Sequence, residues 1–397
     1  MGTITFLTAG ESHGKGLVGI IDGIPAGITL SSEDIDRDLT RRQGGYGRGG
    51  RMKIESDTAE ILSGVRWGKT IGSPVSVLVR NRDWENWMKG MSPSSTDSGS
   101  IPPVISPRPG HADLAGAVKY GTKDIRNILE RSSARETAMR VALGAIARKI
   151  LSEFDIAIGS YVRQIGSILY SRPVPVDGKS LLELSRIAEK SVVRCPDQGV
   201  SGRMVANIDR AIKGKYSLGG IFTVFALGLP PGLGSHVQWD RKLDGKLAQA
   251  IMSIQAIKGV EIGGGFAMAS RPGLEIMDEI YYRAPSNERK MPFFRKTNHA
   301  GGIEGGMTNG MPLVVSAAMK PIPTLSKPLR SVDLITKKSL KAAYERSDIC
   351  AVPAAAVVGE AMVALTLADV FLEKFGGDNR DEIMRNFRGY LSSVSRY

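Results

Sequence analysis

The sequence has very few cysteines. Its 397 residues include only Cys195 and Cys350, which lie far apart and form no CxxC motif. A disulfide framework needs several paired cysteines, and a structural zinc site needs closely spaced Cys or His ligands. The scarcity of cysteine therefore argues against both, and it favours a reduced, cytoplasmic protein.

Targeting and membrane-spanning signals are also missing. The N-terminus, Met-Gly-Thr-Ile-Thr-Phe-Leu, has no basic region ahead of an apolar core, so no signal peptide is predicted. The longest uncharged stretch, residues 216–237, contains two prolines and five glycines. A strand and a turn explain this stretch better than a membrane helix does, so we expect no membrane partner.

Histidine is scarce as well, and the whole chain contains His13, His111, His236 and His299. No two of them have the spacing of metal ligands such as H-x-x-x-H, so we expect no metal. A lone histidine is usually structural, but glycines flank both His13 and His111. Glycine leaves room for a ligand beside the imidazole, which makes these two the candidate catalytic histidines.

The net charge is +13, yet the chain contains no run of five basic residues. Such a chain could bind nucleic acid, an anionic membrane surface or small anions. The basic residues gather among glycines and serines at 41–51, 131–135 and 320–330. Arginine holds phosphate and carboxylate through two-point contacts, so this pattern favours a small anionic substrate and no nucleic acid. Outside enzymes, the Arg-Gly-Gly run around Tyr46 leaves RNA binding as the alternative.

Two common phosphate-binding loops are absent from the sequence. The glycine run at 44–50 lacks the G-x-x-x-x-G-K-[ST] pattern of an ATP-binding loop. The run at 263–265 is too short for a dinucleotide-binding fingerprint. Neither kind of nucleotide site is therefore predicted.

Strand and helix patterns alternate irregularly along the chain. Short runs rich in Ile, Val, Thr and Leu predict strands at 3–8, 17–21, 73–80, 203–209, 219–227 and 313–319. Helical spacing and caps predict a helix from Ser31 or Ser32, and helices at 112–129, 133–152, 179–193, 331–347 and 353–374. Ser133 and Glu136 match a capping box for the helix at 133–152. Regular βαβ units and linkers are lacking, so we expect an α+β architecture in a single domain, residues 1–397.

One strand–turn–helix pattern occurs twice. The turns are Gly23-Ile-Pro-Ala-Gly27 and Gly228-Leu-Pro-Pro-Gly232. Two interpretations are open: a possible internal duplication, with pseudo-repeats at about 1–200 and 201–397, or a coincidence of common turn residues.

Five motifs together resemble those of the chorismate synthase family. They occur in the family's order and reach from residue 5 to about residue 350. Any one of them is modest evidence, whereas five in order are very specific. Residue 130 is Glu where many members carry Gly, and we expect this to be a tolerated variant. The motifs are GESHG at 10–14, RRQGGYGRGGRM at 41–52, RPGHAD at 108–113, RSSARET at 131–137 and GGIEGGMTNG at 301–310.

The resemblance implies a reaction and a fold. The reaction is a 1,4-anti elimination of phosphate from 5-enolpyruvylshikimate-3-phosphate, which yields chorismate and requires reduced FMN without net redox change. The family fold is a β-α-β sandwich, and the assembly is a homotetramer. No segment of reductase size is present, so we expect an external reductant, with NADPH as a possible source. A flavin or NADPH oxidoreductase is the alternative among enzymes.

The resemblance also implies roles for single residues. His13 would protonate the leaving phosphate, His111 would keep the reduced flavin in its productive protonation state, and Asp348 would act as a base with the flavin N5. Ser12 and Ser133 would assist proton transfer. The loops at 44–50 and 301–306 are expected to close the site against water. The predicted substrate or NADPH contacts are Arg42, Arg48, Arg51 and Arg135, and the predicted FMN contacts are Arg131, Ser132, Ser133, Gln255, Ala256, Gly305, Lys320, Pro321, Ile322, Pro323, Thr324 and Arg346.

Overall fold

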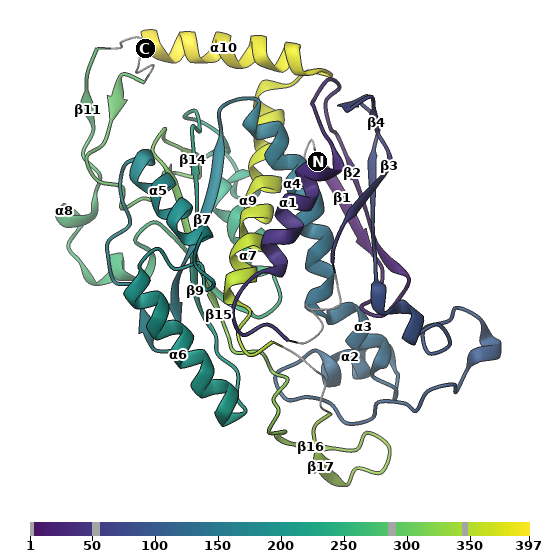
Figure 1. Ribbon diagram of the computed structural model, residues 1–397. Helices are drawn as coiled ribbons and strands as arrows, with labels where there is room; N and C mark the ends of the chain where they lie inside the picture. The colour runs from purple at the N-terminus through teal and green to yellow at the C-terminus, as the bar shows by residue number, and fades with distance from the viewer. Residues whose placement is uncertain (1–3, 50–55, 285–290, 344–347) are drawn as a thin grey trace.

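Two antiparallel sheets form the frame of the molecule (Figure 1). The computed structural model describes residues 4–49, 56–284, 291–343 and 348–397. The first sheet contains β1 (Thr5–Ala9), β2 (Gly16–Asp22), β3 (Ala59–Ser63) and β6 (Val75–Arg80), in the order β1-β2-β6-β3. The second sheet contains β7 (Ala157–Ile165), β8 (Ile168–Leu169), β9 (Gly220–Leu227), β10 (Ile257–Ile262) and β15 (Leu313–Met319), in the order β10-β15-β9-β7-β8.

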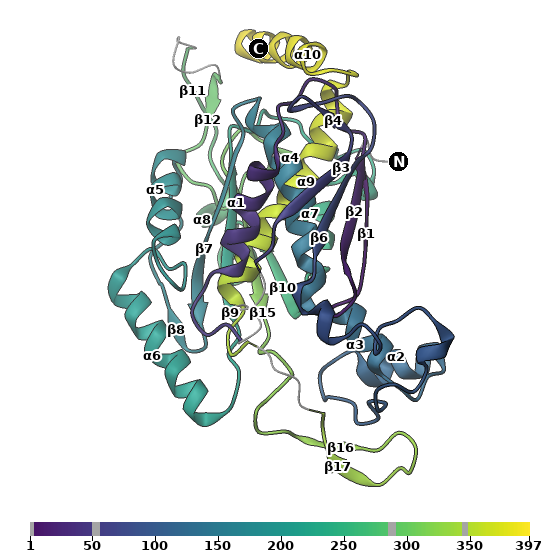
Figure 2. The same ribbon diagram turned by 45° about the vertical axis from the view of Figure 1, so that its right-hand side comes forward.

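A layer of helices lies between the two sheets (Figure 2). Helix α4 (Thr137–Ser152) packs on β2 and β6, whereas α9 (Val352–Phe375) packs on β7 and β9. These two helices also pack on each other, and α1 (Ser32–Gln43) and α7 (Leu243–Met252) lie beside them. Gly144 allows the close approach, because a Cβ on this residue would lie 2.4 Å from the Cβ of Ala361.

The central helix α9 is apolar on all sides. Its length and composition would suit a membrane span, but 89% of its most apolar window is buried inside the protein. A helix that is hydrophobic all round belongs either in a membrane or in the core of a large protein. The two flanking sheets and α4 place α9 in the core.

The remaining elements surround this frame. Helices α5 (Gly178–Glu189) and α6 (Gln198–Gly214) pack on the second sheet, through β7 and β8. Helices α2 (Asp113–Tyr120) and α3 (Arg126–Ser132) lie at one end of the first sheet, and α10 (Arg380–Arg396) lies at the other end of the molecule (Figure 1). Smaller elements are α8 (Gly273–Ile276) and four two-stranded ribbons, β4 (Val65–Arg66) with β5 (Lys69–Thr70), β11 (Tyr281–Tyr282) with β12 (Phe293–Phe294), β13 (Ile303–Glu304) with β14 (Met307–Thr308), and β16 (Arg330–Val332) with β17 (Ser339–Lys341).

The mixed architecture confirms the α+β prediction. The strands expected at 17–21, 73–80, 219–227 and 313–319 are present to within two residues. The helix predicted at 353–374 is α9. In β6, Val75, Val77 and Val79 are fully buried and alternate with more exposed residues, as expected of a strand with one face on the core.

Two predicted elements are wrong. Residues 203–209 lie inside α6 rather than in a strand, because Val200, Met204 and Ile208 recur at helical spacing and Asp197 caps the helix. The helix predicted at 331–347 is replaced, over its described part, by the ribbon β16–β17. Lys337 adopts a φ of 64° between these strands, a left-handed conformation that a continuous helix excludes.

Two helix predictions need smaller corrections. The segment 112–129 forms two helices, because Gly121 ends α2 with a φ of 64°. The segment 133–152 begins with a short 3-10 turn before α4. The Ser133 side chain accepts from Arg135 N, whereas the Glu136 carboxylate binds Thr8, Arg140 and Gln255. Ser133 therefore caps the turn through Arg135 N, and the predicted capping box with Glu136 is not formed.

Candidate active site

Three of the five motifs, at 10–14, 41–52 and 131–137, meet where β1 turns into β2, at the end of the first sheet that faces α3. Gly10 has a φ of 103°, and a Cβ on it would lie 2.3 Å from Gly16 O, so this turn requires glycine. The turn is fixed to α3 from two sides. Ser12 N donates to Glu130 O at 3.1 Å, and Arg131 Nη1 donates to Gly10 O at 3.1 Å.

Two buried arginines share one buried carboxylate next to this turn. Asp57 Oδ1 accepts from Arg135 Nη1 at 2.5 Å, and Asp57 Oδ2 lies 3.5 Å from Arg42 Nη1. Arg42 also donates to Thr137 Oγ1 at 3.0 Å, and Arg135 Nε donates to Asn81 Oδ1 at 2.9 Å. Both guanidinium groups are thereby held in fixed directions.

Arg42 lies near two other arginines and two carboxylates. Burial lowers the pKa of Arg42 to about 10; the charges of Arg48 and Arg135 add to this effect, and those of Asp57 and Asp348 oppose it. Arginine remains charged at neutral pH even so. A buried group of arginines whose charges act on one another is stabilised by an anion that binds among them.

Arg48 reaches the same region from the glycine-rich loop. Its Nη1 lies 3.0 Å from Asp348 Oδ2, and Gly49 N donates to Asp348 Oδ1 at 2.6 Å. Ile349 N donates to Gly47 O at 2.8 Å, so the loop is joined to the segment before α9. The predicted residues Arg51 and Arg346 lie outside the described residues.

Arg41 and Arg42 are neighbours in α1 but face different surroundings. Arg41 points into the helical layer, where its Nη1 and Nη2 donate to Glu360 at 2.8 and 2.9 Å. The fully buried Glu360 also binds Arg148 and Arg194. Burial alone would raise the pKa of Glu360, but the charges of these three arginines lower it far below its usual range.

His13 is bound by Glu130, which was expected to be only a tolerated variant of a glycine position. The Glu130 carboxylate lies 2.8 Å from His13 Nδ1 through Oε1 and accepts from His13 N at 2.7 Å through Oε2. The Trp87 ring packs on the imidazole with 4.3 Å between centroids. Ser12, next to His13, donates from Oγ to Ser133 Oγ at 3.1 Å. His13, Ser12 and Ser133 are therefore brought together.

His111 belongs to a second cluster, with Arg108 and Asp113. Asp113 Oδ1 binds His111 Nδ1, and Asp113 Oδ2 accepts from Arg108 Nε at 2.9 Å. A carboxylate only accepts, so Nδ1 carries a proton, and Arg108 Nη2 lies 3.1 Å from Nδ1 and 3.2 Å from Nε2 of the same ring. Burial would raise the pKa of Asp113, but its hydrogen bonds with His111 and Arg108 lower it below the usual range.

The 320–324 segment completes this second cluster. Arg108 Nη1 donates to Thr324 Oγ1 at 3.0 Å, and Lys320 Nζ binds Gly110 O. Burial and the nearby charge of Lys258 lower the pKa of Lys320. Two lysines that repel each other next to a backbone turn favour an anionic ligand.

Gln255 and Ala256 connect the two clusters. Gln255 Nε2 donates to Glu136 Oε2 at 3.2 Å, close to the arginines, and Ala256 O accepts from Lys320 N at 2.9 Å. Gln255 Oε1 is buried and has no hydrogen-bond partner among the described residues. A buried acceptor without a partner is costly unless a ligand supplies the donor.

Gly305 is the predicted contact that the chain does not bring to these clusters. It lies in the β13–β14 turn, where Gly306 O accepts from Leu243 N at the start of α7. Gln255 follows the other end of this ten-residue helix. Ten helical residues span about 15 Å, so the Gly305 turn is separated from Gln255 by that distance.

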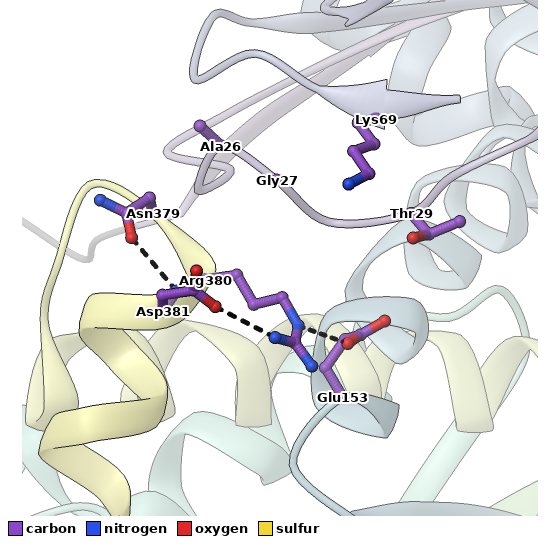
Figure 3. A pocket seen from close by; sticks show the side chains of 8 residues that line it. All are labelled: Ala26, Gly27, Thr29, Lys69, Glu153, Asn379, Arg380 and Asp381. Atoms are coloured by element: carbon purple, nitrogen blue, oxygen red, sulfur yellow. Dashed lines mark hydrogen bonds and ion pairs between the residues drawn. The ribbon is translucent and has the colours of Figure 1, made fainter. Parts of the chain in front are cut away.

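One cavity lies beside the site and another lies far from it. A cavity of about 560 Å³ opens between α2 and α3 and includes Arg131 and Ser132 in its lining. A second cavity of about 440 Å³ lies near the start of α10 (Figure 3). Its Arg380 is bound to Glu153 and Asp381, and no predicted site residue lines it. The first cavity, unlike the second, is therefore lined in part by predicted site residues.

Sequence reasoning missed several residues of the site. Asp57, Asn81 and Trp87 each contact a predicted residue, and Glu130 binds His13 through both carboxylate oxygens. The sequence did contain a sign that Glu130 is part of the site, because this residue departs from the family pattern directly before Arg131. The others had none, since isolated Asp, Asn and Trp residues are common in loops. In the part of the chain that the structure describes, no group of three His, Cys, Asp or Glu side chains could hold a metal.

Comparisons with known proteins agree on one family. Residues 4–372 match the family model described as chorismate synthase. Proteins named chorismate synthase from Aquifex aeolicus and Geobacter metallireducens are 56% and 57% identical to this chain, over 99% of it and 99% and 100% of their own lengths. A solved structure titled "Crystal Structure of Chorismate Synthase" has a TM-score of 0.81 and 47% identity, and the match covers 99% of both chains.

Proposed function

Because the chain belongs to the chorismate synthase family, we propose that the two residue clusters between β1, α3 and the 320–324 segment are its active site. The protein catalyses the family's reaction, the 1,4-anti elimination of phosphate from 5-enolpyruvylshikimate-3-phosphate to give chorismate. It is a lyase of aromatic amino acid biosynthesis, and it requires reduced FMN. The single observation that carries the site assignment is the buried Arg42–Asp57–Arg135 group, which Asn81 joins to the loop that carries His13.

The arginine group would hold the substrate. The substrate carries one phosphate and two carboxylates, and the charges of Arg48 and Arg135 both act on the buried Arg42. Arg51, adjacent in the same motif, is proposed as a further contact. Hydrogen bonds to charged groups contribute about 1.5–3 kcal/mol each, so a few such contacts account for micromolar affinity.

The described residues fit an FMN molecule. The partnerless Gln255 Oε1 can accept an N–H of the ring, and Lys320 can face the phosphate. The cavity of about 560 Å³ is within the usual size of a cofactor site. Residues 131–133, 255–256 and 320–324 would hold the cofactor, and Gly305 and Arg346 remain predicted contacts. When bound, reduced FMN supplies electron density as phosphate departs and takes up the ring hydrogen.

The side chains of the two clusters have separate proposed tasks. His13 delivers a proton to the departing phosphate, and the Ser12–Ser133 hydrogen bond offers a path by which this proton is replaced. Asp348, which pairs with Arg48, would act as a base. His111 keeps its Nδ1 proton on Asp113. For His111 to act on the flavin, the contact of Nε2 with Arg108 has to give way on binding.

The decisive experiment mixes the pure protein anaerobically with chemically reduced FMN and 5-enolpyruvylshikimate-3-phosphate, and follows chorismate and phosphate. We expect equal amounts of both products without net flavin oxidation. Bound FMN without product would indicate a flavin protein of different chemistry. If the protein neither forms product nor binds FMN, the site assignment is wrong and the arginines have to be tested as an RNA surface.

The source of electrons is a separate proposal. We infer that an external system reduces the flavin, with NADPH as a possible donor that contacts Arg42 and Arg48. Because the same arginines are proposed to hold the substrate, NADPH should compete with it. Steady NADPH oxidation by the pure protein and oxidised FMN, unaffected by substrate, would contradict this proposal.

The protein is proposed to work as a cytoplasmic homotetramer. Leu7 and Ile20 are paired across β1 and β2 on the outward face of the first sheet, and they are 77% and 44% exposed. Phe266 and Leu274 are 78% and 99% exposed on another segment. Such apolar surface favours association. Light scattering should give four times the chain mass, and Leu7→Lys with Ile20→Lys should lower it; a monomeric wild-type protein would refute the proposal.

We also infer that the fold is a β-α-β sandwich built by duplication. The order β1-β2-β6-β3 corresponds to β7-β9-β15-β10, with α1 and α7 after the second strand of each set. The two repeated turns are held by equivalent hydrogen bonds. Thr70 Oγ1 donates to Pro25 O and Thr308 Oγ1 donates to Pro230 O, both at 2.6 Å. An experimental structure in which the two halves do not superpose in this strand order would refute the duplication.

A further inference from the structure

Glu130 holds His13 by both of its carboxylate oxygens. Oε2 accepts from His13 N at 2.7 Å, and Oε1 lies 2.8 Å from His13 Nδ1. The Glu130 side chain is only 2% exposed, and the His13 side chain is 17% exposed. A buried carboxylate that binds both the backbone and the ring of one residue fixes the position and the rotation of that ring.

This contact also fixes the tautomer of the imidazole. An ionised carboxylate only accepts hydrogen bonds, so Nδ1 has to carry a proton toward Glu130. The proton that His13 exchanges with a substrate is then carried by Nε2. A partner on one ring nitrogen that selects the proton of the other is the arrangement by which carboxylates orient catalytic histidines in other enzymes.

The surroundings keep Glu130 itself in place. Its backbone carbonyl accepts from Ser12 N at 3.1 Å, and Arg126 Nη1 lies 3.8 Å from its Oε1. The Arg126 guanidinium lies 5.1 Å from the centre of the Trp87 ring, which also packs against His13. The Ser12 contact uses only the backbone of residue 130, so a change of the side chain leaves the attachment of the loop to α3 intact.

We propose that Glu130 is a positioning residue for His13, so that the pair acts as a His–Glu dyad in the elimination. This inference rests on the proposed role of His13 as the proton donor to phosphate. It reverses the expectation that Glu130 is a tolerated variant of a glycine position. A chain with glycine at this position would have to orient the histidine by another contact.

The first test determines the tautomer of the His13 ring by NMR spectroscopy and does not depend on catalysis. The protein contains four histidines, so 15N-histidine labelling gives few signals, and His13→Ala identifies the signal of His13. We expect the wild-type spectrum to show His13 protonated at Nδ1, and Glu130→Gln to lose this state. The same Nδ1 signal in both proteins would overturn the proposal, whether or not the protein makes chorismate.

The second test is a double-mutant cycle on chorismate formation with reduced FMN. Glu130→Gln should lower kcat by about 10- to 100-fold, the usual effect of removing such a supporting carboxylate, with KM changed less than twofold. In the His13→Ala background, the same change should have no further effect. An equal fall in both backgrounds would show that Glu130 acts independently of His13 and would refute the dyad.

Two controls keep the outcomes separate. Melting temperatures report folding, and if Glu130→Gln does not fold, Glu130→Asp replaces it in both tests, because it keeps the charge but shortens the reach. Partial activity in Glu130→Asp, with the loss confined to kcat, supports the dyad, whereas wild-type activity in this variant contradicts it. A wild-type protein that forms no chorismate would refute the proposed function and leave the tautomer result to decide on the dyad.

Discussion

The buried charge of Glu360 allows a direct test of how much one ion-pair network in the core contributes to the stability of the protein. It is fully buried on α9, and it binds Arg41 at 2.8 and 2.9 Å, Arg194 at 3.3 Å, Ser160 at 2.5 Å, and Arg148. Glu360→Gln keeps the shape of the side chain but removes the charge that three arginines share. The three positive charges of the arginines would then lie buried together with less negative charge to balance them.

The magnitude follows from this geometry. Removing one partner of a buried ion pair costs about 3–5 kcal/mol. Asp38 and Glu189 also pair with Arg41 and remain in the variant, so we expect the lower part of this range, about 3 kcal/mol. With ~2.1 cal/mol/K of unfolding entropy per residue, a chain of 397 residues has about 0.8 kcal/mol/K in total, which converts this loss into about 4 °C of melting temperature.

The assay is thermal unfolding of wild type, Glu360→Gln and the control Glu183→Gln at one protein concentration. Glu183 is half exposed and pairs with Arg186 on α5, so the control should melt at the temperature of the wild type. If Glu360→Gln melts within 1 °C of the wild type, where 1 °C corresponds to about 0.8 kcal/mol, the reasoning about the buried charge is refuted.

The effect should depend on pH in a defined direction. Because the pKa of Glu360 is lowered by folding, its contribution is present above the pKa of the unfolded chain and is lost as the pH falls toward the folded value. The difference between wild type and Glu360→Gln should therefore be constant from pH 8 to about pH 5, and should shrink below about pH 4.3, where an unfolded glutamate takes up its proton. A difference that grows on acidification would contradict the assignment.

Three further predictions concern the site. His13→Ala and His111→Ala should each lower kcat by roughly 10²–10⁴, the usual loss of an acid–base group, while FMN titration shows unchanged binding; a loss of FMN affinity instead would make them binding residues. Arg48→Ala should raise the substrate Kd by about 10-fold or more, since one charge-assisted contact is lost, and an unchanged Kd by calorimetry would exclude Arg48 from the substrate site. Hydrogen exchange at residues 44–49 and 301–306 should slow when substrate and FMN bind, and two unchanged loops would refute their closure.

The sequence predicts the frame of this fold well, because its core elements have strong local patterns. The alternating valines of β6 and the apolar stretch of α9 are examples. The prediction fails where local signals compete. Residues 203–209 contain Val, Ile and Met that suit a strand, but the helical spacing over a longer window and the Asp197 cap decide the outcome.

Within the site, motifs identify the chemical groups but not their partners. Arg42, Arg135 and His13 were predicted, whereas Asp57, which binds both arginines, was not. Asp57 and Arg135 are 78 residues apart, and only the packing of α4 against the first sheet brings them together. A local pattern contains no information on such distances, so the dyad of His13 and Glu130 also became visible only in the structure.

The adjacency of Arg41 and Arg42 has an evolutionary consequence. One arginine anchors α1 to Glu360 in the core, and the next points toward Thr137, in the region proposed to hold the substrate. A shift or rotation of α1 that adapted Arg42 to a different substrate would break the contacts of Arg41 as well. New specificity in descendants of this protein is therefore more accessible through Arg48, which lies on a loop outside α1, than through the helix that carries both arginines.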